Sequence, residues 1–386
     1  MSLISRQLAA GIMRKVPVPL TNRPDLSYDI LIEPGLIGRA PSILADMYSG
    51  KSIAVISDRN VASLYGHELT AKLIDKKFRL VEMIEFPAGE ASKCRRVKEQ
   101  VEDRLFEAGM GRDSVVVALG GGVTGDLAGY VAATFNRGVP LVQVPTSLLA
   151  MADSSIGGKV GIDVPWGKNL IGAFHQPSLV LIDPRMLNSL PEQELKSGMA
   201  EVVKHGVIRD ADLFDYIEQH LDRILGREED VMAELVARNC AIKADVVSQD
   251  ERESNLRQIL NFGHTLGHAV ESFSGFGWLH GEAVSCGMAA EAEIAVLMGL
   301  MKPDERDRIT ALLVRIGLPV DIRTLDAGAE TLVKLTRLDK KARTGRARYA
   351  LAAGIGSMAT RADGGYGIEV DEQLVREVLI SIGANG

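Results

Sequence analysis

The chain has 386 residues, of which 46% are hydrophobic and 25% are charged, as in a soluble protein with two ordinary domains or one large one. Its formal net charge of −7 argues against a general nucleic-acid or anionic-membrane surface, and no apolar run is long enough to predict a membrane span. Three widely spaced cysteines without a C-x-x-C pair indicate a reducing compartment and no thiolate metal site. We therefore expect a cytoplasmic protein, and we expect residues 1–24 to form a flexible leader.

The first half of the chain alternates short β-branched runs with segments of helical spacing. Strands are expected at 28–32, 52–56, 80–85, 114–119, 141–144 and 179–182. Helical spacing lies between several of these runs, for example at 92–108. This alternation predicts βαβ units and a largely parallel sheet.

The second half is dominated by long segments of amphipathic helical spacing. These segments cover 192–207, 211–225, 231–249 and 281–298. Ser189 and Glu192 flank an early proline, a pattern typical of a capping box at a helix start. We predict a mostly helical second domain that begins near residue 188.

A glycine-rich turn at 120–126 follows a buried-strand run and precedes helical spacing. Backbone N–H groups at such a turn, together with the positive end of a helix dipole, can bind phosphate. Gly120, Gly122 and Gly125 satisfy G-x-G-x-x-G, although no acid follows about 20 residues later as in the usual dinucleotide pattern. We favour phosphate binding over a purely structural turn. Asp58, just past another strand, is either a ribose-binding acid or a helix cap.

Three of the seven histidines fall between positions 264 and 280. His264 and His268 are four residues apart, so on a helix their imidazoles share one face, and His280 follows. Neutral imidazoles with one carboxylate form a common metal site that keeps a position open for substrate. We favour such a site over hydrogen-bonded core histidines. The spacing leaves open which histidine is not a ligand and which acid joins.

Basic residues are grouped near carboxylates in this acidic chain. Lysines lie in the glycine-supported segments 153–159 and 167–169, and Arg257 precedes the histidines. Glu201 and Lys204 are three residues apart on a predicted helix, where they either face one cavity or form a surface ion pair. A further basic segment contains Lys340, Lys341, Arg343, Arg346 and Arg348. Singly, each residue reads as a solvated charge; together, beside a metal, they suggest a polyanionic substrate.

Taken together, these motifs resemble the 3-dehydroquinate synthase family in order and spacing, from about residue 28 to residue 357. The matching segments are 120–129, 145–150, 153–159, 167–173, 200–204, 250–252, 261–268 and 279–282. The resemblance implies a Rossmann-like NAD-binding domain over 1–187 and a mostly α-helical domain that binds metal and substrate over 188–386. The active site would lie in the cleft between these two domains.

The resemblance also implies site residues. The metal ligands would be Glu201, His264 and His280. His268 would lie next to these ligands, without binding the metal, as a proton-handling or substrate-orienting group. Substrate contacts would come from Asp153, Lys159, Lys168, Asn169, Lys204, Lys243, Arg257, Asn261 and one of Lys340 and Lys341, preferably Lys340. NAD contacts would come from Asp58, Glu90, Lys93, Gly121, Gly122, Val123, Thr124, Gly125, Asp126, Thr146, Ser147, Lys159 and Lys168. Arg137 would reach the substrate phosphate of a neighbouring subunit in a homodimer.

The activity implied is conversion of 3-deoxy-D-arabino-heptulosonate 7-phosphate into 3-dehydroquinate and phosphate, a step of the shikimate pathway. It would proceed by transient NAD-dependent oxidation, phosphate elimination, reduction and intramolecular aldol closure, with Zn²⁺ or Co²⁺ as the metal. Two alternatives stay open. One is a sibling cyclase acting on sedoheptulose 7-phosphate, and the other is a metal-dependent polyol dehydrogenase. A non-catalytic NAD-binding sensor is disfavoured, because binding alone requires no metal.

Overall fold

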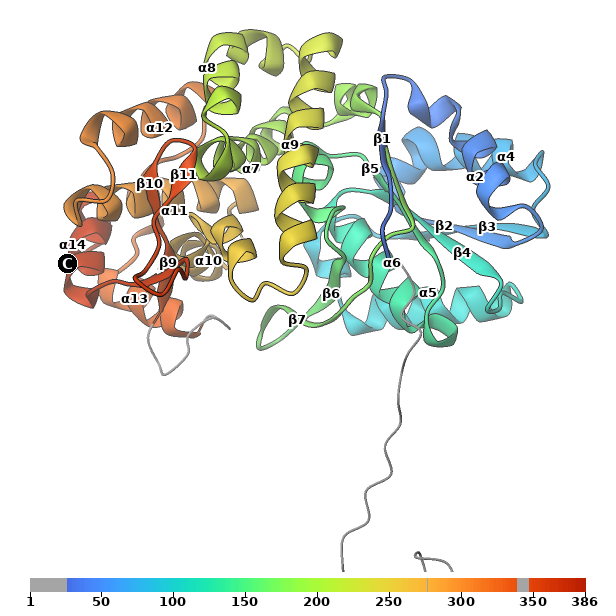
Figure 1. The fold of residues 1–386 in the computed structure, drawn as a ribbon. Coiled ribbons are helices and arrows are strands. Elements are labelled where there is room, and N and C mark those ends of the chain that lie inside the picture. Colours follow the sequence, from blue (N-terminus) through green and yellow to red (C-terminus); the bar gives the residue numbers. More distant parts are fainter. Residues whose placement is uncertain (1–25, 276, 339–346) are drawn as a thin grey trace, which may run out of the picture.

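The computed structural model describes residues 26–275, 277–338 and 347–386. A half built on a parallel sheet and a helical half lie side by side, with the sheet on the right and the helices on the left of Figure 1. The expected order of a parallel-sheet half followed by a helical half is therefore confirmed. Among the described residues, no helix combines the length and the apolar character that crossing a membrane demands.

Within the described residues, the main sheet contains six parallel strands in the order β1-β8-β5-β4-β2-β3. They are β1 (Ile30–Ile32), β2 (Ser52–Asp58), β3 (Leu80–Phe86), β4 (Ser114–Gly120), β5 (Leu141–Pro145) and β8 (Leu179–Ile182). Each corresponds to an expected strand, and the ends differ by no more than two residues. The β-branched runs made these strands easy to predict, because a parallel strand is buried on both faces.

Helices cover both faces of this sheet. Successive strand residues point to opposite faces, so Ile53 and Val55 join one hydrophobic core whereas Ala54 and Ile56 join another. The helices on the two faces are α2 (Ala40–Tyr48) and α4 (His67–Ile74) on one, and α5 (Arg95–Glu107) and α6 (Gly122–Thr134) on the other. The core under α2 and α4 continues into the helical half, which joins the two halves through one apolar interior.

Along the chain, an antiparallel hairpin separate from the main sheet follows β5 and precedes β8. It consists of β6 (Lys159–Val164) and β7 (Gly167–Phe174), where the sequence suggested only glycine-supported loops. Gly161 and Gly172 pair across the hairpin, and a Cβ built on Gly172 would lie 2.2 Å from a carbonyl oxygen of β6. The glycines are thus needed for close strand approach, although glycine is a poor strand former and hid the strand signal.

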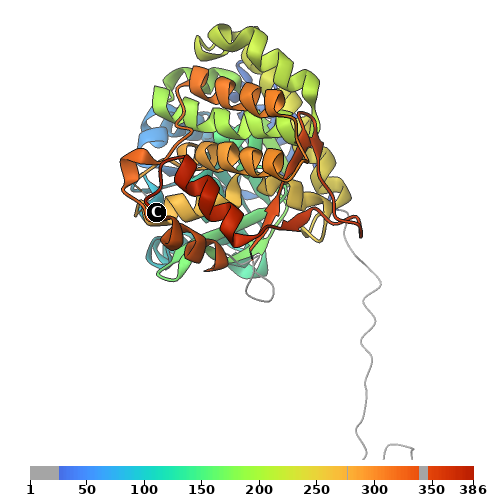
Figure 2. The same ribbon diagram turned by 90° about the vertical axis from the view of Figure 1, so that its left-hand side faces the viewer.

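The helical half contains the expected long helices and several small strands. Its elements are α7 (Glu192–Arg209), α8 (Ala211–Leu225), α9 (Glu229–Gln249), α10 (His264–Phe273), α11 (His280–Leu297), α12 (Pro303–Ile316), α13 (Ala329–Leu338), α14 (Glu372–Ser381), β9 (Arg348–Ala350), β10 (Ala352–Gly354), β11 (Ser357–Met358) and β12 (Gly367–Glu369). Figure 2 shows α12, α7 and α11 as stacked layers. The expectation that α11 is amphipathic is wrong, because this helix is buried on nearly all sides.

Short helical turns connect the longer elements. They are η1 (Leu36–Gly38), α3 (Arg59–Val61), η2 (Ala62–Gly66), η3 (Glu90–Ser92), η4 (Phe135–Arg137), η5 (Ala150–Ser154), η6 (Pro184–Ser189), η7 (Leu256–Asn261) and η8 (Arg323–Leu325). The predicted domain boundary at 187/188 falls within η6. The capping box expected at Ser189 is wrong: its hydroxyl donates to the Met186 carbonyl oxygen at 3.0 Å, and Pro191 occupies the N-cap of α7.

Candidate metal and substrate site

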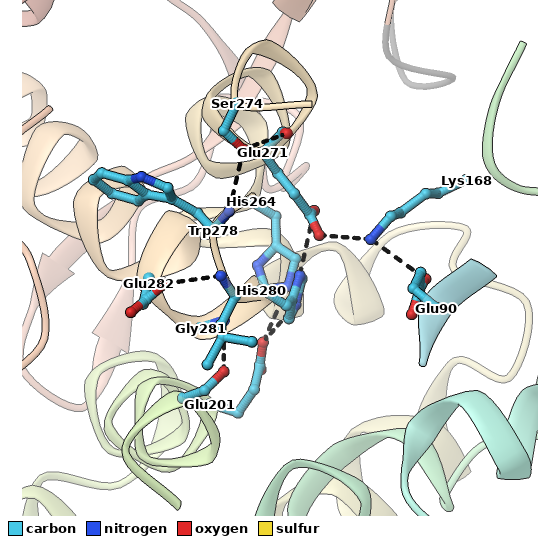
Figure 3. A network of polar contacts seen from close by, with 12 residues as sticks. Glu90, Lys168, Glu201, His264, Glu271, Ser274, Trp278, His280, Gly281 and Glu282 are labelled. Carbon is cyan, nitrogen blue, oxygen red and sulfur yellow. Dashed lines mark hydrogen bonds and ion pairs between the residues drawn. The ribbon is translucent and has the colours of Figure 1, made fainter. Parts of the chain in front are cut away.

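Three helices bring Glu201, His264 and His280 together. Glu201 lies in the middle of α7, His264 begins α10 and His280 begins α11. The Oε1 atom of Glu201 lies 3.2 Å from Nε2 of His264 and 3.4 Å from Nε2 of His280. Figure 3 shows both imidazoles pointing toward this carboxylate. One possible ligand atom from each residue therefore converges within 4.8 Å, as a metal site requires.

Glycines allow the three helices to approach this closely. A Cβ built on Gly281 would lie 1.9 Å from the carbonyl oxygen of Ser197, one turn before Glu201 on α7. A Cβ on Gly287 would lie 1.9 Å from the carbonyl oxygen of Gly263, next to His264. Since no side chain fits at either contact, these glycines fix the separation of the helices that carry the three residues.

The protonation states of the three residues differ. Burial alone would raise the pKa of Glu201, but Lys204 and His264 hold it well below its usual range. Burial and Lys204 lower the pKa of His264 to about 4, so this imidazole is neutral near pH 7. Burial opposes charge on His280 as well, but the carboxylates of Glu201 and Glu271 raise its pKa to about 9. A metal bound here would replace one proton on His280.

The donor set fits a divalent metal such as Zn²⁺ or Co²⁺. Glu201 is 1% exposed, and neither of its carboxylate oxygens accepts a hydrogen bond of good geometry from the described residues, although Lys204 forms an ion pair with it. Two imidazoles and one carboxylate are a common ligand set for a catalytic zinc site with an open position. A second possible set, His268, Glu271 and His280, shares only His280 with the first. A third possible set, Asp153, Glu201 and His205, shares only Glu201 with the first. For His264, His268 and His280, the open question of which one is not a ligand becomes a choice between the first two sets.

Buried cations lie beside the metal trio. Lys204 and Arg257 are each 1% exposed, so the reading of these two residues as solvated surface charges is wrong, and Lys243 is also buried at 5% exposed. Lys243 forms an ion pair with Asp153, yet burial lowers its pKa to about 8. Arg257 donates to backbone carbonyl oxygens of Glu251 and of the loop before β6. A buried cationic cluster of this kind can bind an anionic ligand strongly.

Glu253 joins two of the expected substrate residues. Its carboxylate forms an ion pair with Lys159 and accepts a hydrogen bond from Nδ2 of Asn261 at 2.7 Å. The sequence analysis did not select Glu253, although it directly follows the matched segment 250–252. It also did not select His205, whose Nδ1 lies 3.0 Å from Asn239 Oδ1 and whose Nε2 lies 3.9 Å from Asp153.

Glu271 is a third residue of this region that was not expected from the sequence. It lies on α10, seven residues after His264 and three after His268, so a helical wheel would have placed all three on one face. Its carboxylate contacts Nζ of Lys168 at 2.7 Å and Nδ1 of His280 at 3.5 Å.

Asn169, next to Lys168 on β7, has a φ of 54° and donates its backbone N–H to Asp163.

The glycine-rich turn joins β4 to α6, as a phosphate-binding turn requires. Asp58 caps α3 by accepting from the N–H groups of Asn60 and Val61, and its other oxygen lies 3.5 Å from Thr124 Oγ1. The helix-cap reading of Asp58 is thus confirmed, and its position at the end of β2 keeps it beside the turn. The residues expected to contact NAD in the turn and after β5 occupy one edge of the sheet; they are Gly121, Gly122, Val123, Thr124, Gly125, Asp126, Thr146 and Ser147.

Lys93 forms a buried ionic cluster at this edge. Its ammonium group lies 3.0 Å from Glu90, 3.3 Å from Asp126 and 3.5 Å from Asp163. Burial raises the pKa of Asp126 to about 6 despite the attraction of Lys93. Glu90 also contacts Lys168 at 3.3 Å, which links this cluster to Glu271 and the metal trio.

Among the described residues, Arg137 is an expected site residue for which no contact with this constellation is found. Arg137 is exposed at the end of η4 and has a φ of 70°, a left-handed conformation that is uncommon for arginine. Lys340 and its alternative Lys341 lie outside the described residues.

The fold of the described residues is similar to that of sugar phosphate cyclases. The chain is similar to 2-epi-5-epi-valiolone synthase from Streptomyces hygroscopicus subsp. jinggangensis 5008, solved with NAD⁺ and Zn²⁺, at a TM-score of 0.84 and 29% identity over 95% of this chain and 99% of that chain. It is also similar to 2-deoxy-scyllo-inosose synthase, solved with carbaglucose-6-phosphate, NAD⁺ and Co²⁺, at a TM-score of 0.83 and 28% identity over 92% and 96%.

Within that class, the chain belongs to the 3-dehydroquinate synthase family. The family model for the N-terminal part of 3-dehydroquinate synthase matches residues 83–197, and the model for the C-terminal part matches residues 198–342. A 3-dehydroquinate synthase of Pelobacter propionicus is 48% identical over 342 residues, which cover 87% of this chain and 93% of the relative. The protein is therefore an enzyme of the cyclase and lyase kind.

Proposed function

We propose that the protein converts 3-deoxy-D-arabino-heptulosonate 7-phosphate into 3-dehydroquinate and phosphate and that it requires NAD⁺ and a divalent metal. The observation that carries this proposal is the convergence of Glu201, His264 and His280 beside buried Lys204 and Arg257 in a chain of this family. When bound, NAD⁺ would supply transient oxidation of an alcohol, and Zn²⁺ or Co²⁺ would supply a Lewis acid.

The metal would be held by Glu201, His264 and His280. Lys93, Glu90, Asp58 and the turn at 121–126 would hold the nucleotide at the carboxyl edge of the sheet, where ligands bind in open α/β sheets. The solved structure of the valiolone synthase contains NAD⁺ and Zn²⁺, which supports the choice of these two groups.

The buried cations would bind the two anionic ends of the substrate. Arg257 suits a planar carboxylate, because its guanidinium presents several fixed donors. Lys204 and Lys243 both interact electrostatically with Asp153, and can stabilise the negative charge that grows on a departing phosphate. Lys243, with a pKa lowered to about 8 by burial, can also exchange a proton near neutral pH.

The experiment that tests this function follows phosphate release and NADH absorbance in one cuvette. Purified protein is given 3-deoxy-D-arabino-heptulosonate 7-phosphate with and without NAD⁺, before and after EDTA treatment and Zn²⁺ restoration. We expect phosphate release that requires both NAD⁺ and metal, with no accumulation of NADH. NADH accumulation would instead indicate a polyol dehydrogenase. Turnover only of sedoheptulose 7-phosphate would assign the protein to the sibling cyclases.

We further propose that the enzyme works as a homodimer in which Arg137 serves the neighbouring site. Arg137 is exposed at the end of η4, and its backbone is left-handed. Both features support a contact with a neighbouring subunit. Mixing Arg137→Ala with Glu201→Gln subunits should then restore roughly a quarter of wild-type activity, because each hybrid dimer contains one complete site. If the mixture stays as inactive as its components, Arg137 acts within its own subunit.

A cytoplasmic location is also proposed. Cys94, Cys240 and Cys286 are all free, and the last two are buried, as in proteins kept in a reducing compartment.

A further inference from the structure

Glu271 lies between the metal trio and the nucleotide edge and belongs to neither group. Its side chain is only 5% exposed, and it belongs to α10, two turns after His264. Figure 3 shows its carboxylate between His280 and Lys168. One oxygen, Oε2, faces Nδ1 of His280 at 3.5 Å, and the other, Oε1, accepts from Nζ of Lys168 at 2.7 Å.

The contact with His280 concerns the nitrogen that would not bind metal. Nε2 of His280 faces Glu201, so a ligand bond through Nε2 requires the remaining proton to be on Nδ1. A carboxylate beside Nδ1 holds that proton and prevents the ring from turning. Carboxylates in this position orient metal-binding histidines and increase their basicity, and their loss weakens metal binding.

The contact with Lys168 connects Glu271 to a series of ion pairs in the parallel-sheet half of the molecule. Lys168 lies on β7 and also contacts Glu90 at 3.3 Å, and Glu90 contacts Lys93 at 3.0 Å. Glu271 therefore contacts both the ion pairs of the nucleotide edge, through Lys168, and the metal trio, through His280. Since Lys168 fixes one oxygen of Glu271, it also fixes the direction of the other oxygen toward His280.

We propose that Glu271 is a positioning residue that orients His280 for metal binding, and that Lys168 supports metal binding through Glu271. This inference rests on the proposed function, because it assumes that Glu201, His264 and His280 hold a metal. The rival role for Glu271 is that of a direct ligand with His268 and His280. Against that role, Nε2 of His280 faces Glu201, and Glu271 faces the other ring nitrogen, Nδ1.

The test measures Zn²⁺ affinity by competition with a chromogenic chelator in wild type and variants. Glu271→Gln should weaken Zn²⁺ binding about 10- to 100-fold, the usual effect of losing a carboxylate behind a histidine ligand. Glu282→Gln is the matched control: this residue lies two positions after His280, but its carboxylate caps α11 at Leu279 N, which an amide oxygen can still do. Its Zn²⁺ affinity should match that of the wild type.

A double-mutant cycle tests the role of Lys168. Lys168→Met should weaken Zn²⁺ binding several-fold by itself but should have no further effect in the Glu271→Gln background. Unchanged affinity in Glu271→Gln, or additive effects in the double variant, would overturn the inference. A loss of Zn²⁺ binding as complete as in Glu201→Gln would make Glu271 a ligand. Wild-type protein that binds no Zn²⁺ would overturn the proposed function as well, whereas normal wild-type turnover with an unaffected Glu271→Gln variant would overturn the positioning role alone.

Discussion

Replacing His268 with alanine should lower turnover by about 10²- to 10⁴-fold, the usual contribution of a positioned proton-transfer group, while Zn²⁺ affinity stays at the wild-type value. His268 lies one turn after His264 on α10, and its ring centroid is 5.3 Å from that of His264 and 6.1 Å from that of His280. It is thus beside the metal trio, but Glu201 Oε1 faces the other two histidines. An imidazole in this place can donate or accept a proton without binding the metal.

The measurement pairs steady-state phosphate release with metal content after dialysis. His220→Ala is a matched control, because His220 is also a half-buried histidine on a helix, but it contacts the Tyr216 carbonyl oxygen and stacks on the Tyr216 ring within its own helix. The control should keep both activity and metal. Metal loss in His268→Ala would favour the alternative set of His268, Glu271 and His280, and would reverse our assignment of the ligands.

Replacing Glu201 with glutamine should remove both tight Zn²⁺ binding and turnover, and should also destabilise the folded protein. The first effect follows because the trio loses its only anionic ligand. The second follows because Lys204, which is 1% exposed, loses its ion-pair partner. Breaking a buried ion pair by removing one member costs up to about 3–5 kcal/mol in the free energy of unfolding.

A second substitution separates these two effects. Glu201→Gln/Lys204→Met removes the buried charge as well as its partner, so the free energy of unfolding should recover most of its loss, whereas Zn²⁺ binding should not return. Urea unfolding of metal-free samples measures the first quantity, and chelator competition measures the second. If Glu201→Gln still binds Zn²⁺ tightly, Glu201 is not a ligand. Equal unfolding free energies for wild type and Glu201→Gln would show that Lys204 finds compensation elsewhere, with Asp153 as the nearest candidate.

The parts of the molecule that could be predicted from sequence are those with strong local periodicity. Strands such as β4 and helices such as α8 were placed within one residue, because burial on both faces and amphipathic spacing are local patterns. The β6–β7 hairpin was missed, since its glycines serve contacts with a strand that pairs only after folding. The cap of α7 was misplaced for a similar reason, because Ser189 is used by the preceding turn and accepts from Tyr65 of a distant helix.

The candidate site divides in the same way. The types of residue and their grouping could be read from the sequence and its family resemblance: histidines at 264, 268 and 280, an acid at 201 and lysines at 159, 168, 204 and 243. Spacing could not choose among the histidines, because the choice depends on which imidazole nitrogen faces a carboxylate on a different helix. Glu271 shares a helix face with His264, but its contacts with Lys168 and His280 arise only when β7 and α11 pack against α10.

The sequence by itself thus determined the family, the order of a parallel-sheet half and a helical half, and the chemical types of residue in the site. Local patterns suffice for these features because periodicity and motif spacing are properties of neighbouring residues. The tertiary structure alone decided that Lys204, Lys243 and Arg257 are buried, that Glu201 faces two histidines and that Glu271 connects the nucleotide edge to His280. Burial and charge pairing depend on segments far apart in the chain, and they determine the pKa values and ligand geometry on which catalysis depends.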